Sequence, residues 1–231
     1  MDLPCQTSAP VVNGKLIDVY DDLEAVKAVV LNELDNESND VVVVTHSYGC
    51  IPGLSALAGL SPEARSAAGR KTAVRGAAVL AGFLIPTGAR FIDLMPNGQL
   101  PPQYLLENNL TLPFAGPGAI HILYQDIPLV EQQKAIMRMK TQSHGVNICP
   151  MPDMVAGFQG IPVSLLVCKN DNAVAPEAYA GTVEGLKATD YAGHIEYADS
   201  GHSPFIGMPV PTAKFVRKAA GEDIVTGFAS S

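Results

Sequence analysis

The residues best suited to chemistry in this sequence surround Ser47, in the segment Thr45-His46-Ser47-Tyr48-Gly49 that follows the run Val41–Val44. A serine hydroxyl is a weak nucleophile that must be both activated and exposed. A sharp turn from a buried strand into a helix exposes it, and favours small residues two positions before and after, as in G-x-S-x-G. Gly49 fits the second position, whereas Thr45 stands where glycine is usual. The segment alone fits a plain strand end equally well.

Two later segments supply partners that would activate such a serine. Asp171 follows the apolar segment Val163–Cys168, and His202 lies in a tight turn after Ile195–Tyr197. A carboxylate at such a position can orient an imidazole, which can then act as general base. The order Ser, Asp, His is that of α/β-hydrolases. Asp199 is the other candidate for the acid, but three residues from His202 it is better suited to shaping the turn.

Neighbouring side chains are expected to complete the site. Tyr48 follows the serine at the start of the expected helix, so its backbone N–H would donate to a developing oxyanion. His46, Phe83 and Phe205 are candidates for the wall of a substrate pocket. Cys50 lies just past the turn and is expected to pack inward.

Alternating strands and helices must position these residues. Apolar segments predict strands buried on both faces, as in a parallel sheet; they are Val41–Val44, Val74–Phe83, Val163–Cys168 and Ile195–Tyr197. Between them, spacing predicts helices from Asp21 or Asp22 to about Leu34, from Pro128 to about Lys140 and from Pro211 to Ala220. We expect an α/β fold with a mostly parallel sheet and flanking helices.

The expected organisation is a single domain, residues 1–231, with one insertion. Residues 86–158 are poor in strand signals and interrupt the strand–helix rhythm, so they predict a lid over the strand ends. Near the start of the chain, Asn13-Gly14 between short apolar pairs predicts a hairpin, or equally a surface loop.

Composition excludes several classes of protein. The 231 residues carry a net charge of −8 without a basic run, which argues against nucleic acid and anionic membrane as partners. An apolar fraction of 47% excludes global disorder. The stretch Gly76–Ile85 is too short to span a bilayer, for which about 20 residues are needed. Four unpaired cysteines and no histidine cluster predict neither disulfide nor metal. We expect a cytoplasmic protein without a cofactor.

Three segments together make the sequence similar to a known family. VVVVTHSYGCIPG (41–53), VSLLVCKNDNAVAP (163–176) and DSGHSPF (199–205) resemble small, cofactor-free α/β-hydrolases, a family that includes plant methylesterases and hydroxynitrile lyases. The resemblance implies that Ser47 is the nucleophile, Asp171 the acid and His202 the base. It also implies a short lid helix within Tyr124–Lys140.

The function implied by this resemblance is hydrolysis of a small hydrophobic ester or lactone, of the kind found in secondary metabolism, through an acyl-enzyme. Two alternatives stay open at this point. One is a degenerate member that binds a ligand without turnover. The other is a lyase or cyclase that uses His202 as a base on the same scaffold.

The chain departs from the family pattern at its beginning. Met1-Asp2-Leu3-Pro4 resembles the end of a strand that family members reach only after earlier strands and a His-Gly or Pro-Gly loop. The resemblance therefore implies that these strands and that loop, which supplies an oxyanion donor, are missing; one such donor is worth about 10²–10³ in rate. Val41–Val44 would then be an open, aggregation-prone edge. Residues 5–19 or a second copy in a homo-oligomer could cover it, unless the natural protein is longer.

Overall fold

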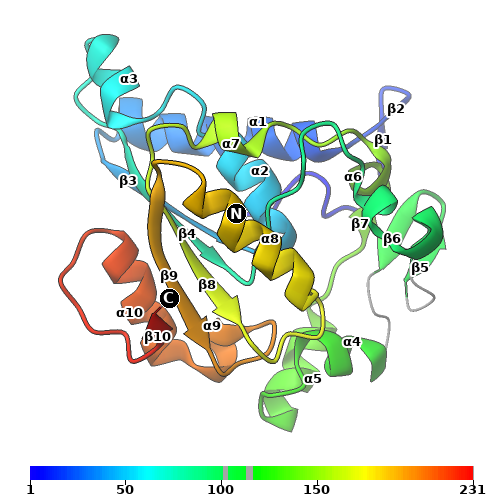
Figure 1. The fold of residues 1–231 in the computed structure, drawn as a ribbon. Coiled ribbons are helices and arrows are strands. Elements are labelled where there is room, and N and C mark those ends of the chain that lie inside the picture. Colours follow the sequence, from blue (N-terminus) through cyan, green and yellow to red (C-terminus); the bar gives the residue numbers. More distant parts are fainter. Residues whose placement is uncertain (101–103, 113–116, 231) are drawn as a thin grey trace.

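The computed structural model describes residues 1–100, 104–112 and 117–230, and its centre is a five-stranded sheet (Figure 1). The strand order is β10-β9-β8-β4-β3. The pairs β3–β4, β4–β8 and β8–β9 are parallel, and β10 pairs antiparallel with β9. The strands are β3 (Val41–His46), β4 (Val74–Leu80), β8 (Val163–Cys168), β9 (Ala192–Ala198) and β10 (Ala229–Ser230). The mostly parallel α/β sheet expected from the sequence is confirmed; β10 was not predicted.

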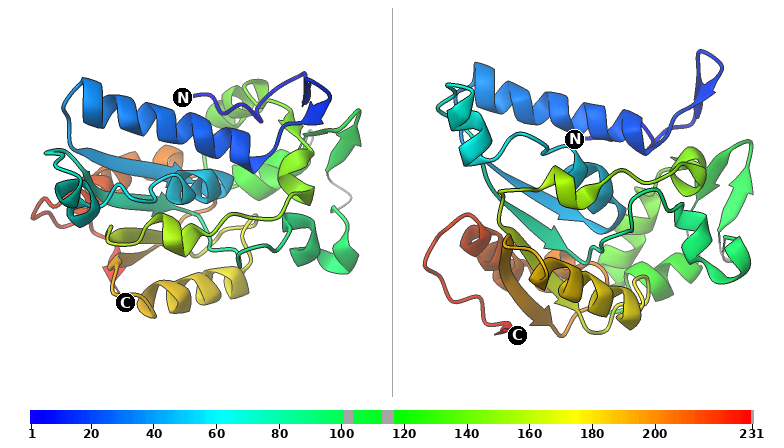
Figure 2. Two further views of the ribbon diagram at one scale, coloured as in Figure 1. Left: turned by 90° about the horizontal axis from the view of Figure 1, so that it is seen from above. Right: turned by 45° about the horizontal axis from the view of Figure 1, so that its top comes forward.

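Helices cover both faces of the sheet, and the alternation of side chains along each strand explains the division. Val79 and Leu165 face the larger core. Helices α1, α2, α7 and α8 contribute to this core, and their arrangement around the sheet can be followed in Figure 1 and Figure 2. Leu80 and Leu166, the next residues, face the smaller core beneath Phe215 of α10. These helices are α1 (Val19–Leu31), α2 (Cys50–Ser55), α7 (Met154–Gly157), α8 (Pro176–Lys187) and α10 (Pro209–Ala219). Among the described helices, none combines the length and apolarity that a membrane crossing requires.

Strand β3 is an edge strand, which corrects one expectation. Val41–Val44 was predicted to be buried on both faces, yet Val44 is 49% exposed. Val44 is in register with Ala78, so it lies on the face that α10 covers farther along the sheet. Within the described residues no strand pairs with the outer side of β3. The open edge is therefore as expected, whereas its cover by a second copy stays a prediction.

The N-terminal region confirms one expectation and corrects another. The short strands β1 (Val11–Val12) and β2 (Lys15–Leu16) form a hairpin, with Asn13 and Gly14 both at positive φ as the tight turn requires. Helix α1, however, begins earlier than predicted. Its cap is Asp18, whose side chain accepts from the Tyr20 N–H at 2.9 Å, whereas Asp22 is already inside the helix.

The segment between β4 and β8 contains more strand than the sequence predicted. A three-stranded antiparallel sheet is formed by β5 (Leu105–Glu107), β6 (Leu110–Leu112) and β7 (Gln142–Ser143). Helices α4 (Pro117–Leu123) and α5 (Leu129–Met137) lie between β6 and β7 in sequence. Figure 1 shows these elements together at one end of the main sheet. Residues 101–103 and 113–116 of the expected lid lie outside the described residues.

The remaining helical elements are short. They are η1 (Asn32–Asn36), η2 (Ser47–Gly49), α3 (Pro62–Ala67), η3 (Phe91–Leu94), η4 (Pro96–Gly98), α6 (Gly145–Ile148) and α9 (Pro204–Gly207).

The N-terminal segment is hydrogen-bonded to the far end of the lid region. Thr7 and Thr141 exchange two hydrogen bonds, one from the Thr7 N–H at 3.1 Å and one from the Thr141 hydroxyl at 2.6 Å. The Ser143 N–H donates to the Cys5 carbonyl at 2.8 Å, and the Ser143 hydroxyl donates to the Ile17 carbonyl at 2.6 Å. One wall of the molecule is thus assembled from residues more than a hundred positions apart.

Candidate active site

Ser47 occupies a strained turn between β3 and the helical segment that follows. Its φ is +51°, in the left-handed region that costs an ordinary residue roughly 1–2 kcal/mol. The chain passes directly from β3 into η2 and then α2. The first N–H groups of such a helical segment lack intrahelical acceptors, so they are free to bind negative charge near the serine. The sharp strand-to-helix turn expected at Ser47 is therefore present, and Ser47 itself is half-buried; its role as a nucleophile stays a prediction.

The small-residue requirement of this turn is met in an unexpected way. A Cβ added at Gly53 would lie 2.5 Å from Thr45 Cγ2, so Thr45 fits where glycine is usual because Gly53 opposite it has no side chain. A Cβ added at Gly49 would meet nothing within 4 Å. In this protein the crowded position is therefore Gly53, and Gly49 is not required by packing.

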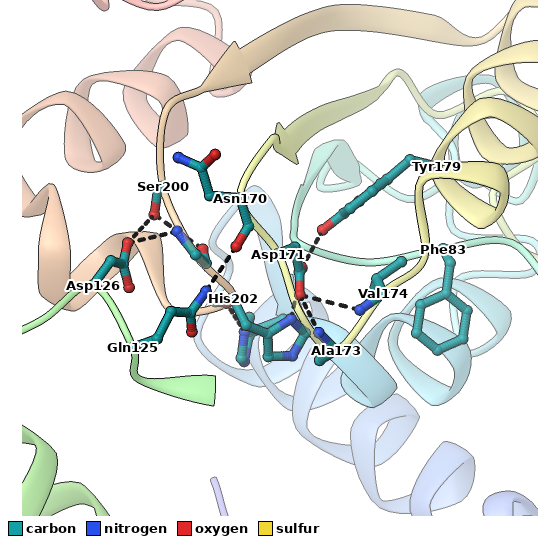
Figure 3. A network of polar contacts seen from close by, with 12 residues as sticks. Phe83, Gln125, Asp126, Asn170, Asp171, Ala173, Val174, Tyr179, Ser200 and His202 are labelled. Atoms are coloured by element: carbon teal, nitrogen blue, oxygen red, sulfur yellow. Dashed lines mark hydrogen bonds and ion pairs between the residues drawn. The ribbon is translucent and has the colours of Figure 1, made fainter. Parts of the chain in front are cut away.

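Asp171 and His202 form a buried pair. The His202 Nδ1 and Asp171 Oδ2 atoms are 2.8 Å apart, and both side chains are almost fully buried (Figure 3). Asp171 also accepts from the N–H groups of Ala173 and Val174, at 2.7 and 3.0 Å, and from the Tyr179 hydroxyl at 2.6 Å. Burial acts to raise the pKa of Asp171, but the hydrogen bond and positive charge of His202, aided by the other donors, lower it overall. The carboxylate therefore stays ionised, as an acid that orients an imidazole must.

His46 holds the backbone of His202 by a hydrogen bond to its carbonyl. Its Nε2 lies 2.8 Å from the His202 carbonyl oxygen. Burial, with a contribution from the charge of His202, lowers the pKa of His46 to about 4, so its ring is neutral near pH 7. Because a carbonyl can only accept, the proton of this neutral ring must be on Nε2. Phe205 packs edge-on against His46, with ring centroids 4.9 Å apart.

A cavity of about 210 Å³ lies over these residues. Ser47 and His202 both line it, as do the predicted pocket residues His46 and Phe83 and the side chain of Tyr48. Other apolar walls come from the segment between β4 and β8 and from the loop after Asp171: Phe91, Leu123, Val146 and Val174.

Phe205 does not line this cavity. It is 42% exposed and packs against the His46 ring, and it is not among the residues that surround the cavity. Of the predicted pocket residues, Phe205 is thus not brought to the cavity in this structure, because α9 places it edge-on against His46.

The predicted inward packing of Cys50 has a consequence for the pocket. The Cys50 thiol donates to the Phe83 carbonyl at 3.1 Å and accepts from the Phe83 N–H at 3.4 Å. Burial raises the pKa of Cys50 to about 12, so the group remains a thiol and not a reactive thiolate. Cys50 thus positions a wall residue of the cavity.

Asp22 and Tyr179 are site-supporting residues that the sequence did not reveal. Asp22 is fully buried and accepts from the Tyr48 hydroxyl at 2.8 Å and from the Cys5 N–H at 2.7 Å. Burial raises the pKa of Asp22, in opposition to these hydrogen bonds. Asp22 resembled a helix cap in the sequence, and no local pattern distinguishes Tyr179 from any other residue on the inner face of a helix.

With the fold and the site described, comparison with known proteins identifies the class. The chain matches the alpha/beta hydrolase family over residues 1–215, and it belongs to that family. The hydrolase class predicted from the sequence is confirmed. The protein named "Probable hydrolase R7" from Phoma sp. is 28% identical over 189 residues, which are 79% of this chain and 70% of that protein.

Solved structures at lower identity share the fold. A pyrethroid hydrolase from Sphingobium faniae has a TM-score of 0.65 at 16% identity, over 96% of this chain and 85% of the other. A methylesterase from Arabidopsis has a TM-score of 0.58 at 16% identity, over 88% and 78% of the two chains. At such identities the likeness concerns the fold alone.

Proposed function

We propose that this protein is a serine hydrolase that cleaves a small hydrophobic carboxylic ester or lactone through an acyl-enzyme. The observation that carries the proposal is the buried Asp171–His202 pair, whose histidine lines the same cavity as the strained Ser47. In this proposal Ser47 is the nucleophile, His202 the general base and Asp171 the orienting acid.

The hydrogen-bond chemistry supports these roles. A carboxylate can only accept, so His202 carries its proton on Nδ1 and leaves the Nε2 lone pair free to take the proton of Ser47. Ser47 Oγ then attacks the substrate carbonyl, and the Tyr48 N–H donates to the oxyanion. The imidazolium returns its proton to the leaving alkoxide, and a water activated by the same base releases the acid. Asp171 stabilises the charged ring during both steps.

The cavity supports a small, apolar substrate. Its volume of about 210 Å³ lies below the roughly 300–1,000 Å³ typical of pockets for drug-sized ligands. The walls are mostly apolar and aromatic, including Phe83, Phe91 and Val174. An acyl group of a few carbons bound to a compact alcohol, or a small lactone, fits these properties.

The deciding experiment is labelling of the purified protein with a fluorophosphonate, read by intact mass. We expect one adduct on the wild type, none on Ser47→Ala and strongly reduced labelling of His202→Ala. Ser203→Ala is the matched control, because Ser203 lines the same cavity and should be dispensable for labelling. Absence of an adduct on folded wild type would contradict the proposal and favour a binding protein. Turnover without an acyl-enzyme or incorporated water would favour a lyase or cyclase.

A further inference from the structure

The loop between α4 and α5 reaches the segment that carries the acid. Gln125 Nε2 in this loop donates to the Asn170 carbonyl at 2.7 Å, one residue before Asp171 (Figure 3). The opposite atom of the amide, Gln125 Oε1, is buried without a partner in the described part of the chain. The amide is therefore held in place by its contact with the acid-bearing loop.

The next residue of the same loop reaches the segment that carries the base. Asp126 Oδ2 accepts from the Gly201 N–H at 2.5 Å and from the Ser200 hydroxyl at 3.3 Å (Figure 3). Gly201 directly precedes His202. Two adjacent lid residues thus hold the acid loop and the base loop at the same time.

The fit of this loop against the base segment is tight. A Cβ added at Gly201 would lie 2.6 Å from Gln125 Nε2 and 2.7 Å from Asp126 Oδ1. The two site loops contact each other as well, since the Asn170 N–H donates to the Ser200 carbonyl at 3.0 Å. The three segments form a closed set of hydrogen bonds, so the lid loop is bonded to both site loops.

The same lid segment also forms part of the cavity. Leu123 and Tyr124, which directly precede Gln125, line the space over Ser47. A further bond joins α4 to the acid loop, from Asn172 Nδ2 to the His121 carbonyl at 2.8 Å. Residues that would touch substrate are therefore continuous with residues that hold the site loops.

We propose that Gln125 and Asp126 are positioning residues that set the separation between the Asp171 loop and the His202 loop. When the lid packs over the cavity, the same contacts then align the base His202 with its acid Asp171. The proposal rests on the proposed function, because it assigns these residues to the same base and acid. Neither residue contacts the reacting atoms; both act through the backbone next to the pair.

The first test separates alignment from substrate binding. With p-nitrophenyl butyrate as the probe substrate, we expect Asp126→Ala to lower kcat about tenfold while KM changes less than about twofold. Asp126→Asn keeps an oxygen acceptor for the Gly201 N–H and should restore most of kcat. Glu131→Ala is the matched lid control, because the Glu131 side chain on α5 pairs with Lys134 and is 43% exposed. A rise in KM with unchanged kcat in Asp126→Ala would overturn the proposal, since it would reduce Asp126 to a lid anchor.

A second readout does not need turnover. The Nδ1 proton shared between His202 and Asp171 should give a downfield proton NMR resonance, assigned by its loss in His202→Ala. We expect Asp126→Ala to shift or broaden it, and Asp126→Asn and Glu131→Ala to leave it as in the wild type. An unchanged resonance in Asp126→Ala would overturn the proposal even if the enzyme is inactive. If the wild type is neither labelled nor active but the resonance responds, the proposed function fails and the positioning role stands.

A third variant approaches the same contact from the other side. The Cβ of Gly201→Ala should displace Gln125 and Asp126, so kcat should fall as in Asp126→Ala. Because both changes break one contact, their effects should not multiply, and the double variant should lose at most about twofold beyond either single one. Fully multiplicative losses would show that the two residues act independently and would contradict the proposal.

Discussion

His46 makes a quantitative prediction about stability in acid. In the unfolded chain a histidine is protonated as the pH falls through about 6.5, whereas burial keeps folded His46 neutral until about pH 4. Between these values the unfolded state binds the extra proton, so the free energy of unfolding must fall as the pH falls. Each pH unit in this range changes the free energy of unfolding by about 1.36 kcal/mol. The fall in pH from 6.5 to about 4 therefore lowers the free energy of unfolding by about 3 kcal/mol.

The variant His46→Gln isolates this contribution, because glutamine does not titrate and offers an N–H for the His202 carbonyl. We expect the free energy of unfolding of the variant to fall about 3 kcal/mol less than that of the wild type between pH 7 and pH 4. The chain contains no tryptophan, so urea unfolding is best followed by far-ultraviolet circular dichroism. His194→Gln is the matched control, because it makes the same replacement at an exposed histidine of β9.

Two results would refute this reasoning. One is a pair of parallel stability curves for the wild type and His46→Gln across the interval. The other is an NMR titration in which the His46 ring protonates near pH 6.5 in the folded protein. Either would mean that water reaches the ring, so that burial does not set its charge.

Three further predictions concern other parts of the site and the sheet. Tyr179→Phe removes a charge-assisted hydrogen bond to Asp171, so the free energy of unfolding at pH 7 should fall by about 1.5–3 kcal/mol. Urea unfolding should show that this difference persists above the ordinary aspartate pKa near 3.8 and shrinks as the pH falls through the lowered pKa of Asp171. Ser47→Gly should prevent fluorophosphonate labelling yet raise the melting temperature by roughly 1–4 °C in calorimetry, because glycine tolerates the positive φ, whereas Ser47→Ala should bring no such gain. Val44→Lys should reduce concentration-dependent self-association in sedimentation experiments, since a lysine on an edge strand opposes pairing; equal association of variant and wild type would exclude this edge as the contact.

The sequence predicted β3 and β8 well because each is a short apolar run that ends in a polar segment. Ser47, Asp171 and His202 follow β3, β8 and β9, and parallel strands place these ends at one edge of the sheet. The burial of Val44 was predicted wrongly, because an apolar run does not show which strand will be outermost or how far a helix will extend over it.

Contacts between distant segments could not be predicted in this way. The sequence predicted Asp21 or Asp22 as the cap of α1, and only the fold shows that Asp18 is the cap and that Asp22 lies inside and binds Tyr48. Strand β7 contains only Gln142–Ser143, which has no strand pattern of its own and exists through pairing with β6. The hydrogen bonds of Gln125 and Asp126 likewise depend on how the lid loop meets two other loops.

The bonding of the N-terminal segment to the lid region bears on the order in which this protein folds. The partners Thr7 and Thr141 are separated by 134 positions, so joining them closes a very long loop. The conformational entropy of that loop must be lost before the contact can stabilise the fold. The strands β3, β4 and β8 can pair without it. The wall made by Thr7, Thr141 and Ser143 should therefore form last and open first, and the amides of Thr7 and Ser143 should exchange with deuterium through local openings well before those at the centre of β8.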